Sequence, residues 1–336
     1  MKQSNFDIEP LGFPWRTPNP FLFCVYHEDH FPAGNEKLGP KTGLDGRALG
    51  SDFEIRNGYR MYHGKTVPGF PAHPHRGFET ITIVETGLVD HSDSLGATGR
   101  FGQGDVQWMT AGKGVQHSEM FPLLKEDEKN PLVLFQIWLN LPRKSKMVEP
   151  HYKMLWHEDI PIHLSKDENG KTRRVKIVAG EFQGKKALRS TPDSWAAHPE
   201  NDVQVWLIDL EPGARFDLPV QKTDSNRSLF FYKGNSFKLN GENITRHSAI
   251  HAHDDISINN GPEASSFLLL QGKPIDEPVH QHGPFVMNSQ AEIRQAILDY
   301  QKDQFGGWPW PVAEHVHPRS KGRFAQHADG RIEERG

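Results

Sequence analysis

The stretch GFPAHPHRGFETITIVETG (residues 69–87) carries two histidines one residue apart and then runs into alternating small and β-branched residues. On an extended strand, residues i and i+2 point to the same face, so His73 and His75 can converge on one point. The segment GDVQWMTAGKGVQHSEM (residues 104–120) repeats this spacing with His117 and Glu119. Two neighbouring strands of this kind would present three imidazoles and one carboxylate to a single site.

This donor set indicates a metal centre with open positions. Three nitrogens and one oxygen leave room on a six-coordinate metal, which suits iron and also nickel, copper or manganese. A closed structural zinc site more often uses thiolates, and Cys24 is the single cysteine of the chain. Open positions imply bound water or substrate, and therefore catalysis or ligand sensing. Glu79, at i+4 from His75, is either a fifth ligand or a hydrogen-bond partner of a ligand histidine, and we favour the second.

A His-x-His pair is weak evidence by itself. The chain contains four such pairs: His73/His75, His251/His253, His280/His282 and His315/His317. Surface histidines, or buried ones with satisfied hydrogen bonds, are the usual explanation. The first pair stands apart because a second His-x-Glu motif follows it on a further strand-like run.

Composition favours a compact β-rich protein. The 336 residues suffice for two domains, and they include 31 Gly, 25 Pro and 10% aromatic residues. The net charge of −4 does not indicate the excess of positive charge that favours binding to nucleic acid or to an anionic membrane. The first residues lack the pattern of a signal peptide, and no apolar run is long enough for a membrane helix. We expect a soluble cytoplasmic protein with no direct nucleic-acid or membrane contact.

Strand-like runs recur along the chain, most of them rich in Val, Ile, Phe and Thr and closed by Gly, Asn or Pro. They are FLFCVYH (21–27), ETITIVETG (79–87), DVQWMTAG (105–112), LVLFQIWLNL (132–141), VKIVAGE (175–181), VQVWLIDL (203–210), SLFFYKGN (228–235), ISINNG (256–261) and SFLLLQG (266–272). This spacing predicts an antiparallel sandwich or barrel. A charged stretch after residue 143 looks like a linker. We predict an N-terminal lobe over 1–145, a linker over 146–175 and a C-terminal lobe over 176–287.

One helix is predicted near the C-terminus, over residues 288–305. Ser289 and Glu292 form a capping-box pattern, and Gly306 supplies a stop. The apolar stripe at helical spacing consists of Ile293, Ala296, Ile297 and Tyr300. Residues 306–336 are expected to form an extended tail that wraps another surface.

The two lobes also look like a diverged repeat. TITIVETG (80–87) aligns with RSLFFYKGN (227–235) at an offset of 147 residues, so that Gly87 meets Gly234. At this offset the second-lobe equivalents of His73, His75 and Glu79 are Val220, Lys222 and Asn226. Since the histidines are missing there, we expect one metal and not two.

The motifs together resemble the pirin family of the cupin superfamily. The segment 71–121 matches the pirin signature almost throughout, and KMVEPHY (146–152), EPVHQHGPFVMN (277–288) and EIRQAILDYQ (292–301) resemble further pirin segments. The resemblance implies an all-β bicupin, in which two jelly-roll-like β-barrels lie face to face and the N-terminal one holds a single metal. The family's four ligands fall on His73, His75, His117 and Glu119, which leaves Glu79 unligated.

The resemblance also implies two functions. One is an iron-dependent dioxygenase that opens the heterocyclic ring of flavonols such as quercetin, with Glu119 also taking the hydroxyl proton. Fe(II) is then the expected metal, with Ni, Cu, Mn, Co or Zn as alternatives. The other is a metal- or redox-sensing regulator that binds a protein partner without physiological catalysis. Phe70 and Arg76, which flank the histidine pair, are candidates for the pocket mouth.

Overall fold

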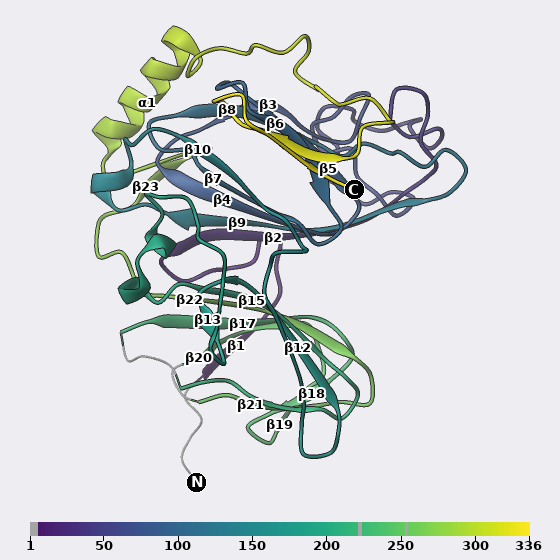
Figure 1. Cartoon of the computed structure of the whole chain (residues 1–336), viewed down its shortest axis with the longest axis vertical. Coiled ribbons are helices and arrows are strands. Elements are labelled where there is room, and N and C mark those ends of the chain that lie inside the picture. Colours follow the sequence, from purple (N-terminus) through teal and green to yellow (C-terminus); the bar gives the residue numbers. More distant parts are fainter. Residues whose placement is uncertain (1–5, 221–223, 253–254) are drawn as a thin grey trace. The chain divides into compact units, whose positions relative to one another are not determined.

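The computed structural model describes residues 6–220, 224–252 and 255–336, so that Lys222 and His253 lie outside the described residues (Figure 1). The chain divides into two compact units, and both are discontinuous in sequence. Unit 1 comprises Met1–Val25, Ile137–Asn140 and Glu158–Asp276, and unit 2 comprises Tyr26–Gln136, Leu141–His157 and Glu277–Gly336. The C-terminal segment therefore belongs to the unit that carries the two histidine motifs.

Unit 2 is built on two antiparallel sheets, and the second of them carries all four proposed metal ligands on β3 (Gly69–His75) and β8 (Val115–Met120). The first has the order β10 (His151–Leu155), β7 (Val106–Thr110), β4 (Phe78–Thr86), β9 (Asn130–Asn140) and β2 (Phe21–Phe31), the last two of which continue into unit 1. The second has the order β26 (Ile332–Arg335), β25 (Arg323–Gln326), β6 (Thr98–Gly102), β5 (Leu88–Asp93), β8 (Val115–Met120) and β3 (Gly69–His75). A short hairpin adds β23 (His280–His282) and β24 (Phe285–Met287).

The two sheets of unit 2 pack on one apolar core. Val84 and Leu134 come from the first sheet, and Val89 and Phe101 from the second, and all four are buried in the same cluster. Alternation along each strand explains this, because every second residue points inward. The sheets remain separate rather than closing into a continuous barrel, as in a cupin whose two sheets face each other.

Unit 1 repeats this plan with a larger and a smaller sheet. The larger has the order β1 (Phe6–Pro10), β20 (Ser248–Ala252), β17 (Asn226–Lys233), β22 (Ser265–Gly272), β15 (Gln204–Leu210), β12 (Thr172–Ala179) and β11 (Ile162–Lys166). The smaller has the order β16 (Arg215–Asp217), β21 (Ser257–Asn260), β18 (Phe237–Leu239) and β19 (Glu242–Ile244). A hairpin of β13 (Glu181–Phe182) and β14 (Lys185–Lys186) and the short helices η2 (Trp195–Ala197) and η3 (Pro199–Asn201) complete it.

Each strand-like run read from the sequence coincides with a strand, and the proposed repeat is visible in the backbone. β4 and β17 both end before a glycine with positive φ, +85° at Gly87 and +110° at Gly234. A side chain on Gly87 would also meet the carbonyl oxygen of Pro131 at 2.7 Å. Glycine is favoured at both positions because this backbone conformation strains other residues. The segment 146–175 holds β10, β11 and the beginning of β12.

The predicted helix is confirmed as α1 (Gln290–Asp303), the single α-helix of the described residues. The side chain of Ser289 accepts a hydrogen bond from the backbone N–H of Glu292, and the carboxylate of Glu292 accepts one from the backbone N–H of Asn288 at 2.9 Å. The apolar stripe packs on β24 through a cluster with Phe285. In Figure 1, α1 lies beside the edge of unit 2 where β3 and β8 end.

The tail after α1 is tied into unit 2 by a buried arginine. Arg100 on β6 donates from Nε and Nη2 to the two carboxylate oxygens of Asp90, at 2.7 and 2.8 Å. Its remaining N–H groups donate to the backbone carbonyls of His317, Pro318 and Lys321. The tail then forms β25 and β26, and β25 pairs with β6 (yellow in Figure 1). The tail thus extends the six-stranded sheet as its edge.

Candidate metal centre

The two histidine motifs form neighbouring strands, as their spacing indicates. β3 lies at the edge of the six-stranded sheet and pairs with β8 in antiparallel register, with His73 opposite His117. The register shifts between Phe70 and His73, which marks an irregularity directly before the histidine pair. Directly opposite residues share a face of the sheet, so both motifs point to the same space inside unit 2.

The side chains of the four predicted ligands gather at this place. One ring nitrogen from each of His73, His75 and His117 lies within 4.8 Å of the others. The Nε2 atoms of His73 and His75 are 3.2 Å apart, and Nε2 of His117 is 4.0 Å from Oε2 of Glu119. This is one centre with three imidazoles and an adjacent carboxylate.

The chemical state of these residues fits a bound metal. Burial lowers the pKa of His73 to about 4 and the pKa values of His75 and His117 well below the usual range. The ring of His73 adds to the lowering at His75, and the rings of His73 and His75 add to it at His117. The imidazoles are therefore neutral at pH 7, which is the form that binds metals. Both ring nitrogens of His117 are buried without a hydrogen-bond partner among the described residues. A metal ion would satisfy this otherwise costly arrangement.

Two polar side chains from the facing sheet hold Glu119. The hydroxyl of Thr82 on β4 donates to its Oε1 at 2.9 Å, and Nε2 of Gln136 on β9 donates to its Oε2 at 3.1 Å. Burial raises the pKa of Glu119, while these two hydrogen bonds act in the opposite direction. Sequence reasoning did not identify Thr82 or Gln136. The sequence nevertheless held a signal for both residues: they are polar and point inward on predicted strands, where a buried polar side chain needs a hydrogen-bond partner.

Two of the remaining predicted pocket residues, Glu79 and Phe70, contact polar and aromatic side chains. Glu79 is buried on β4 and accepts hydrogen bonds from the hydroxyl of Thr110 at 2.7 Å and from the indole N–H of Trp108 at 3.2 Å. Phe70 packs its ring near that of His73, with 6.3 Å between centroids.

Arg76 is buried where α1 meets the end of β3. It donates to Asp299 on α1 at 2.6 Å and to the carbonyl oxygen of Lys113 at 2.5 Å, and its guanidinium lies over the ring of Phe305. These contacts give the guanidinium a part in holding α1 against the strands. A place for Arg76 and Phe70 at the mouth of the metal pocket remains a prediction.

A fourth histidine, which sequence reasoning missed, lies beside the centre. His91 on β5 is fully buried and sits directly opposite Glu119 in the β5–β8 pairing. Its ring centroid is 5.5 Å from that of His117, and it stacks on the ring of Tyr152 at 4.8 Å with an interplanar angle of 10°. His91 and Asp93 repeat the i, i+2 spacing of the recognised motifs, and this was the signal in the sequence.

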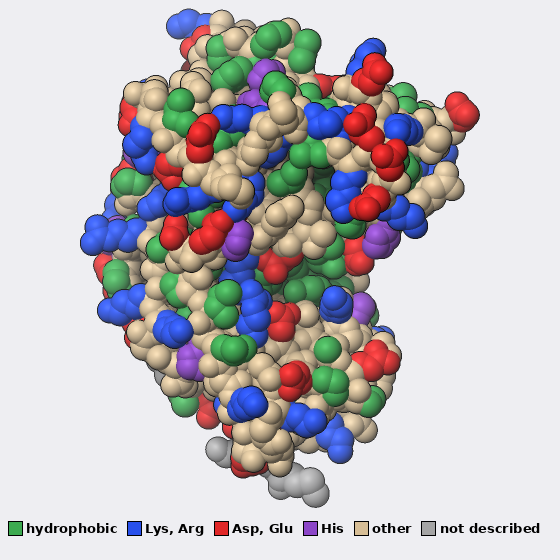
Figure 2. Space-filling view, turned by 45° about the vertical axis from the view of Figure 1, so that its right-hand side comes forward, with side chains coloured by type: hydrophobic (Ala, Val, Ile, Leu, Met, Phe, Trp, Pro, Cys, Tyr) green, Lys and Arg blue, Asp and Glu red, His purple; other side chains and the backbone are tan. Residues whose placement is uncertain are grey.

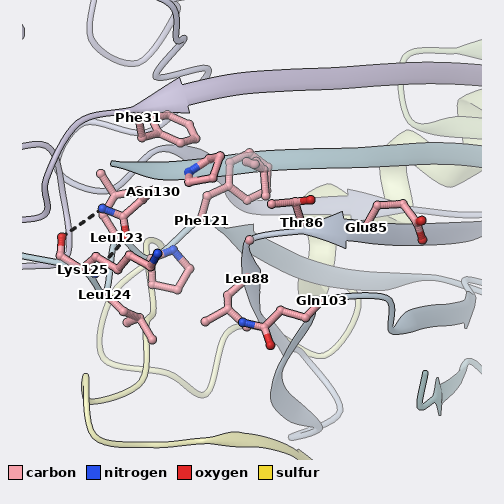
Figure 3. A pocket seen from close by; sticks show the side chains of 14 residues that line it. Phe31, Glu85, Thr86, Leu88, Gln103, Phe121, Leu123, Leu124, Lys125 and Asn130 are labelled. Carbon is pink, nitrogen blue, oxygen red and sulfur yellow. Dashed lines mark hydrogen bonds between the residues drawn. The ribbon is translucent and has the colours of Figure 1, made fainter. Parts of the chain in front are cut away.

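A separate cavity of about 330 Å³ lies where β4 ends and β5 begins, beside the residues that follow β8 (Figure 3). Its lining includes none of the proposed ligands and combines an apolar set with a few polar side chains: Phe31, Glu85, Thr86, Gly87, Leu88, Gln103, Phe121, Pro122, Leu123, Leu124, Lys125, Asn130, Pro131 and Leu132. Asn130 and Lys125 are hydrogen-bonded to each other at its side. This volume is in the range of small-molecule pockets, but the cavity is distinct from the metal centre.

The lowered pKa values predict acid-resistant metal retention. A proton displaces the metal only when it can charge an imidazole, and protonation of His73 begins as the pH falls toward its pKa of about 4. We therefore expect bound metal to stay constant from pH 8 to about 5.5 and to decline below that, measured by metal analysis after dialysis at each pH. Loss centred near pH 6.5, the ordinary pKa of histidine, would contradict the lowered pKa of His73.

The support of Glu119 predicts a second effect. Gln136→Leu removes one of its two hydrogen-bond donors, and loss of such a partner commonly costs about 10–100-fold in metal affinity. The affinity is measured by competition with a chromophoric chelator. Gln281→Leu, on exposed β23, is the matched control and should leave the affinity unchanged. Equal affinities for wild type and Gln136→Leu would show that the hydrogen bond from Gln136 to Glu119 does not support metal binding.

The described residues contain no helix long and apolar enough to span a membrane. On the face shown in Figure 2, acidic and basic side chains lie interspersed. This agrees with the small net charge of −4.

Comparison with known proteins gives consistent matches to both halves of the chain. The family model described as Pirin matches residues 46–139, and the model described as Pirin C-terminal cupin domain matches residues 205–306. The chain is 38% identical to the human protein named "Pirin" over 256 residues, which covers 73% of this chain and 80% of that protein. It is 37% identical over 243 residues to a Pseudomonas aeruginosa protein named "Putative quercetin 2,3-dioxygenase", covering 70% of this chain and 79% of the other.

A solved structure agrees with these sequence matches. The crystal structure of quercetin 2,3-dioxygenase from Acinetobacter baumannii superposes with a TM-score of 0.68 at 30% sequence identity. The superposition covers 86% of this chain and 87% of that protein. The match therefore extends across both halves of the fold.

Proposed function

This chain belongs to the pirin family, and from that premise we propose that it is a metal-dependent dioxygenase that opens the heterocyclic ring of flavonols such as quercetin. The observation that carries the proposal is the convergence of three neutral imidazoles, those of the buried His75 and His117 and the half-buried His73, beside Glu119. The relatives named as quercetin 2,3-dioxygenases support the choice of reaction. We propose Fe(II) as the metal; nickel, copper, manganese, cobalt and zinc accept similar donors.

The proposed roles of the protein groups follow from their positions. A bound metal supplies open coordination positions for a substrate oxygen and dioxygen. The three histidines and Glu119 would hold it, and Glu119 is also placed to take the proton of the flavonol 3-hydroxyl. Burial raises the pKa of Glu119, which makes it a stronger base than an exposed carboxylate. Thr82 and Gln136 keep this carboxylate oriented while the proton moves.

The overall reaction consumes one dioxygen and one flavonol and releases carbon monoxide together with the ring-opened ester. Water must be kept from the reacting atoms during this step. The burial of His75, His117 and Glu119 supports such exclusion, because these side chains lie under the strands of both sheets of unit 2. Phe70, next to His73, offers an aromatic face for the flavonol ring system.

The direct test is oxygen consumption. Protein loaded anaerobically with Fe(II) is mixed with quercetin and air-saturated buffer, and oxygen uptake is followed with an electrode while carbon monoxide is trapped. Uptake with equal amounts of carbon monoxide supports the proposal. Iron bound at one equivalent without uptake would contradict it and favour the alternative, a metal-sensing regulator that acts through a protein partner.

A further inference from the structure

The hydrogen bonds of His91 determine which of its ring nitrogens can accept. Nε2 of His91 is 3.2 Å from Oδ2 of Asp93. The other oxygen of Asp93 accepts hydrogen bonds from the backbone N–H groups of Leu95 and Ala97, both at 2.9 Å. These two donors fix the carboxylate, so that it acts as acceptor toward Nε2–H of His91. In the neutral ring, Nδ1 then carries the lone pair.

Nδ1 of His91 is buried and has no hydrogen-bond partner among the described residues. One face of the His91 ring stacks on Tyr152, and its Nε2 is hydrogen-bonded to Asp93. The ring lies on the same side of the sheet as Glu119. A buried acceptor without a partner is costly, and such groups in native proteins usually meet water or a ligand. The ring of His117, a proposed metal ligand, is 5.5 Å away from the His91 ring.

We propose that His91 is a second hydrogen-bond acceptor of the metal centre, beside Glu119, and that the two together select phenols with adjacent hydroxyl groups. His91 and Glu119 are opposite each other on neighbouring strands, which puts their side chains on one face of the sheet, and in the proposal a ligand at the metal meets both acceptors. A water molecule or a 1,2-diphenol has two hydrogens to donate and engages both. A monophenol has one and leaves an acceptor unsatisfied, which weakens its binding.

This inference rests on the proposed function only in requiring a metal that binds phenols; it does not require turnover of quercetin. The role assigned to His91 depends on which ring nitrogen holds the proton and not on a change of charge. Asp93→Asn tests this directly. The amide nitrogen of asparagine would donate to Nε2 and move the ring proton to Nδ1, which turns the acceptor into a donor while the stacked ring stays in place.

The experiment measures anaerobic binding of 4-nitrocatechol and 4-nitrophenol to the Fe(II)-loaded protein by absorbance, together with iron content. Wild type is compared with His91→Phe, which keeps a ring against Tyr152, with His91→Gln, which restores an acceptor, and with Asp93→Asn. We expect iron content to be equal in all four. Affinity for 4-nitrocatechol should fall about tenfold in His91→Phe and Asp93→Asn, and affinity for 4-nitrophenol less than twofold; His91→Gln should recover part of the loss.

Three results with the variants would overturn the inference. They are unchanged 4-nitrocatechol affinity in both His91→Phe and Asp93→Asn, an equal loss for both phenols, and a loss of iron that accompanies the loss of affinity. The last would make His91 a ligand or a support of the fold. Wild-type protein that holds iron but binds neither phenol would also refute it. If the phenols bind as expected and quercetin is not oxidised, the dioxygenase proposal fails and the role of His91 stands.

Discussion

His117→Ala is expected to lower oxygen uptake with quercetin by more than about 100-fold and to lower bound iron in parallel. Loss of an outer partner of a ligand alone costs about 10–100-fold, and loss of a ligand should cost more. The ring of His117 lies near those of His73 and His75, and both its nitrogens are buried without a partner among the described residues. Iron is measured by elemental analysis and uptake with an oxygen electrode.

The matched control is His280→Ala. His280 also belongs to a His-x-His pair on a strand of unit 2, but it is only half-buried, on the short strand β23, with Nδ1 3.3 Å from the amide of Gln290. Its removal should leave iron and oxygen uptake as in wild type. Full activity in His117→Ala, or an equal loss in both variants, would contradict the assignment of the centre. A matching unfolding temperature for both variants would show that the difference is local.

Arg100→Met is expected to destabilise unit 2 by about 3–5 kcal/mol, which corresponds to a fall in melting temperature on the order of 10 °C. The substitution leaves the carboxylate of Asp90 buried without its guanidinium partner and removes three hydrogen bonds to the tail carbonyls of residues 317, 318 and 321. Thermal unfolding followed by circular dichroism measures the shift. Limited proteolysis should show faster cleavage within residues 318–336.

Arg331→Met provides the comparison on the same tail. Arg331 is exposed and pairs with Glu333 at 2.7 Å, and exposed ion pairs contribute about 0–1 kcal/mol. Its melting temperature should therefore stay within about 2 °C of wild type. If Arg100→Met unfolds at the wild-type temperature and its tail is no more sensitive to protease, the buried arginine does not hold the tail in place.

Much of the fold was accessible from local patterns. Most of the strands that were read from the sequence are rich in Val, Ile, Phe and Thr and are closed by Gly, Asn or Pro, and β4 and β17 end before a glycine with positive φ. The capping residues of α1 acted through contacts within one turn, between Ser289 and Glu292. Such signals survive in the sequence because the interacting groups are neighbours along the chain.

β5 was not identified, and His91 was missed with it. The strand reads LVDHSD, and its polar residues do not resemble a buried strand, yet five of its six positions are buried. The carboxylate of Asp90 accepts hydrogen bonds from the guanidinium of Arg100. The carboxylate of Asp93 is hydrogen-bonded to His91 and accepts a hydrogen bond from the backbone of the following turn. A polar strand is stable inside the unit only because its partners come from β6, the tail and its own turn, and these partnerships are invisible to periodicity.

The sequence alone determined the identity of four candidate ligands, because the i, i+2 spacing forces each pair onto one face of its strand. Tertiary structure decided the rest. Antiparallel pairing of β3 with β8 brought His73 opposite His117, and the facing sheet supplied Thr82 and Gln136 to orient Glu119. Burial between the sheets then removed the charge of the imidazoles. Burial and hydrogen bonding depend on residues distant in the chain, and only the packed sheets bring those residues together.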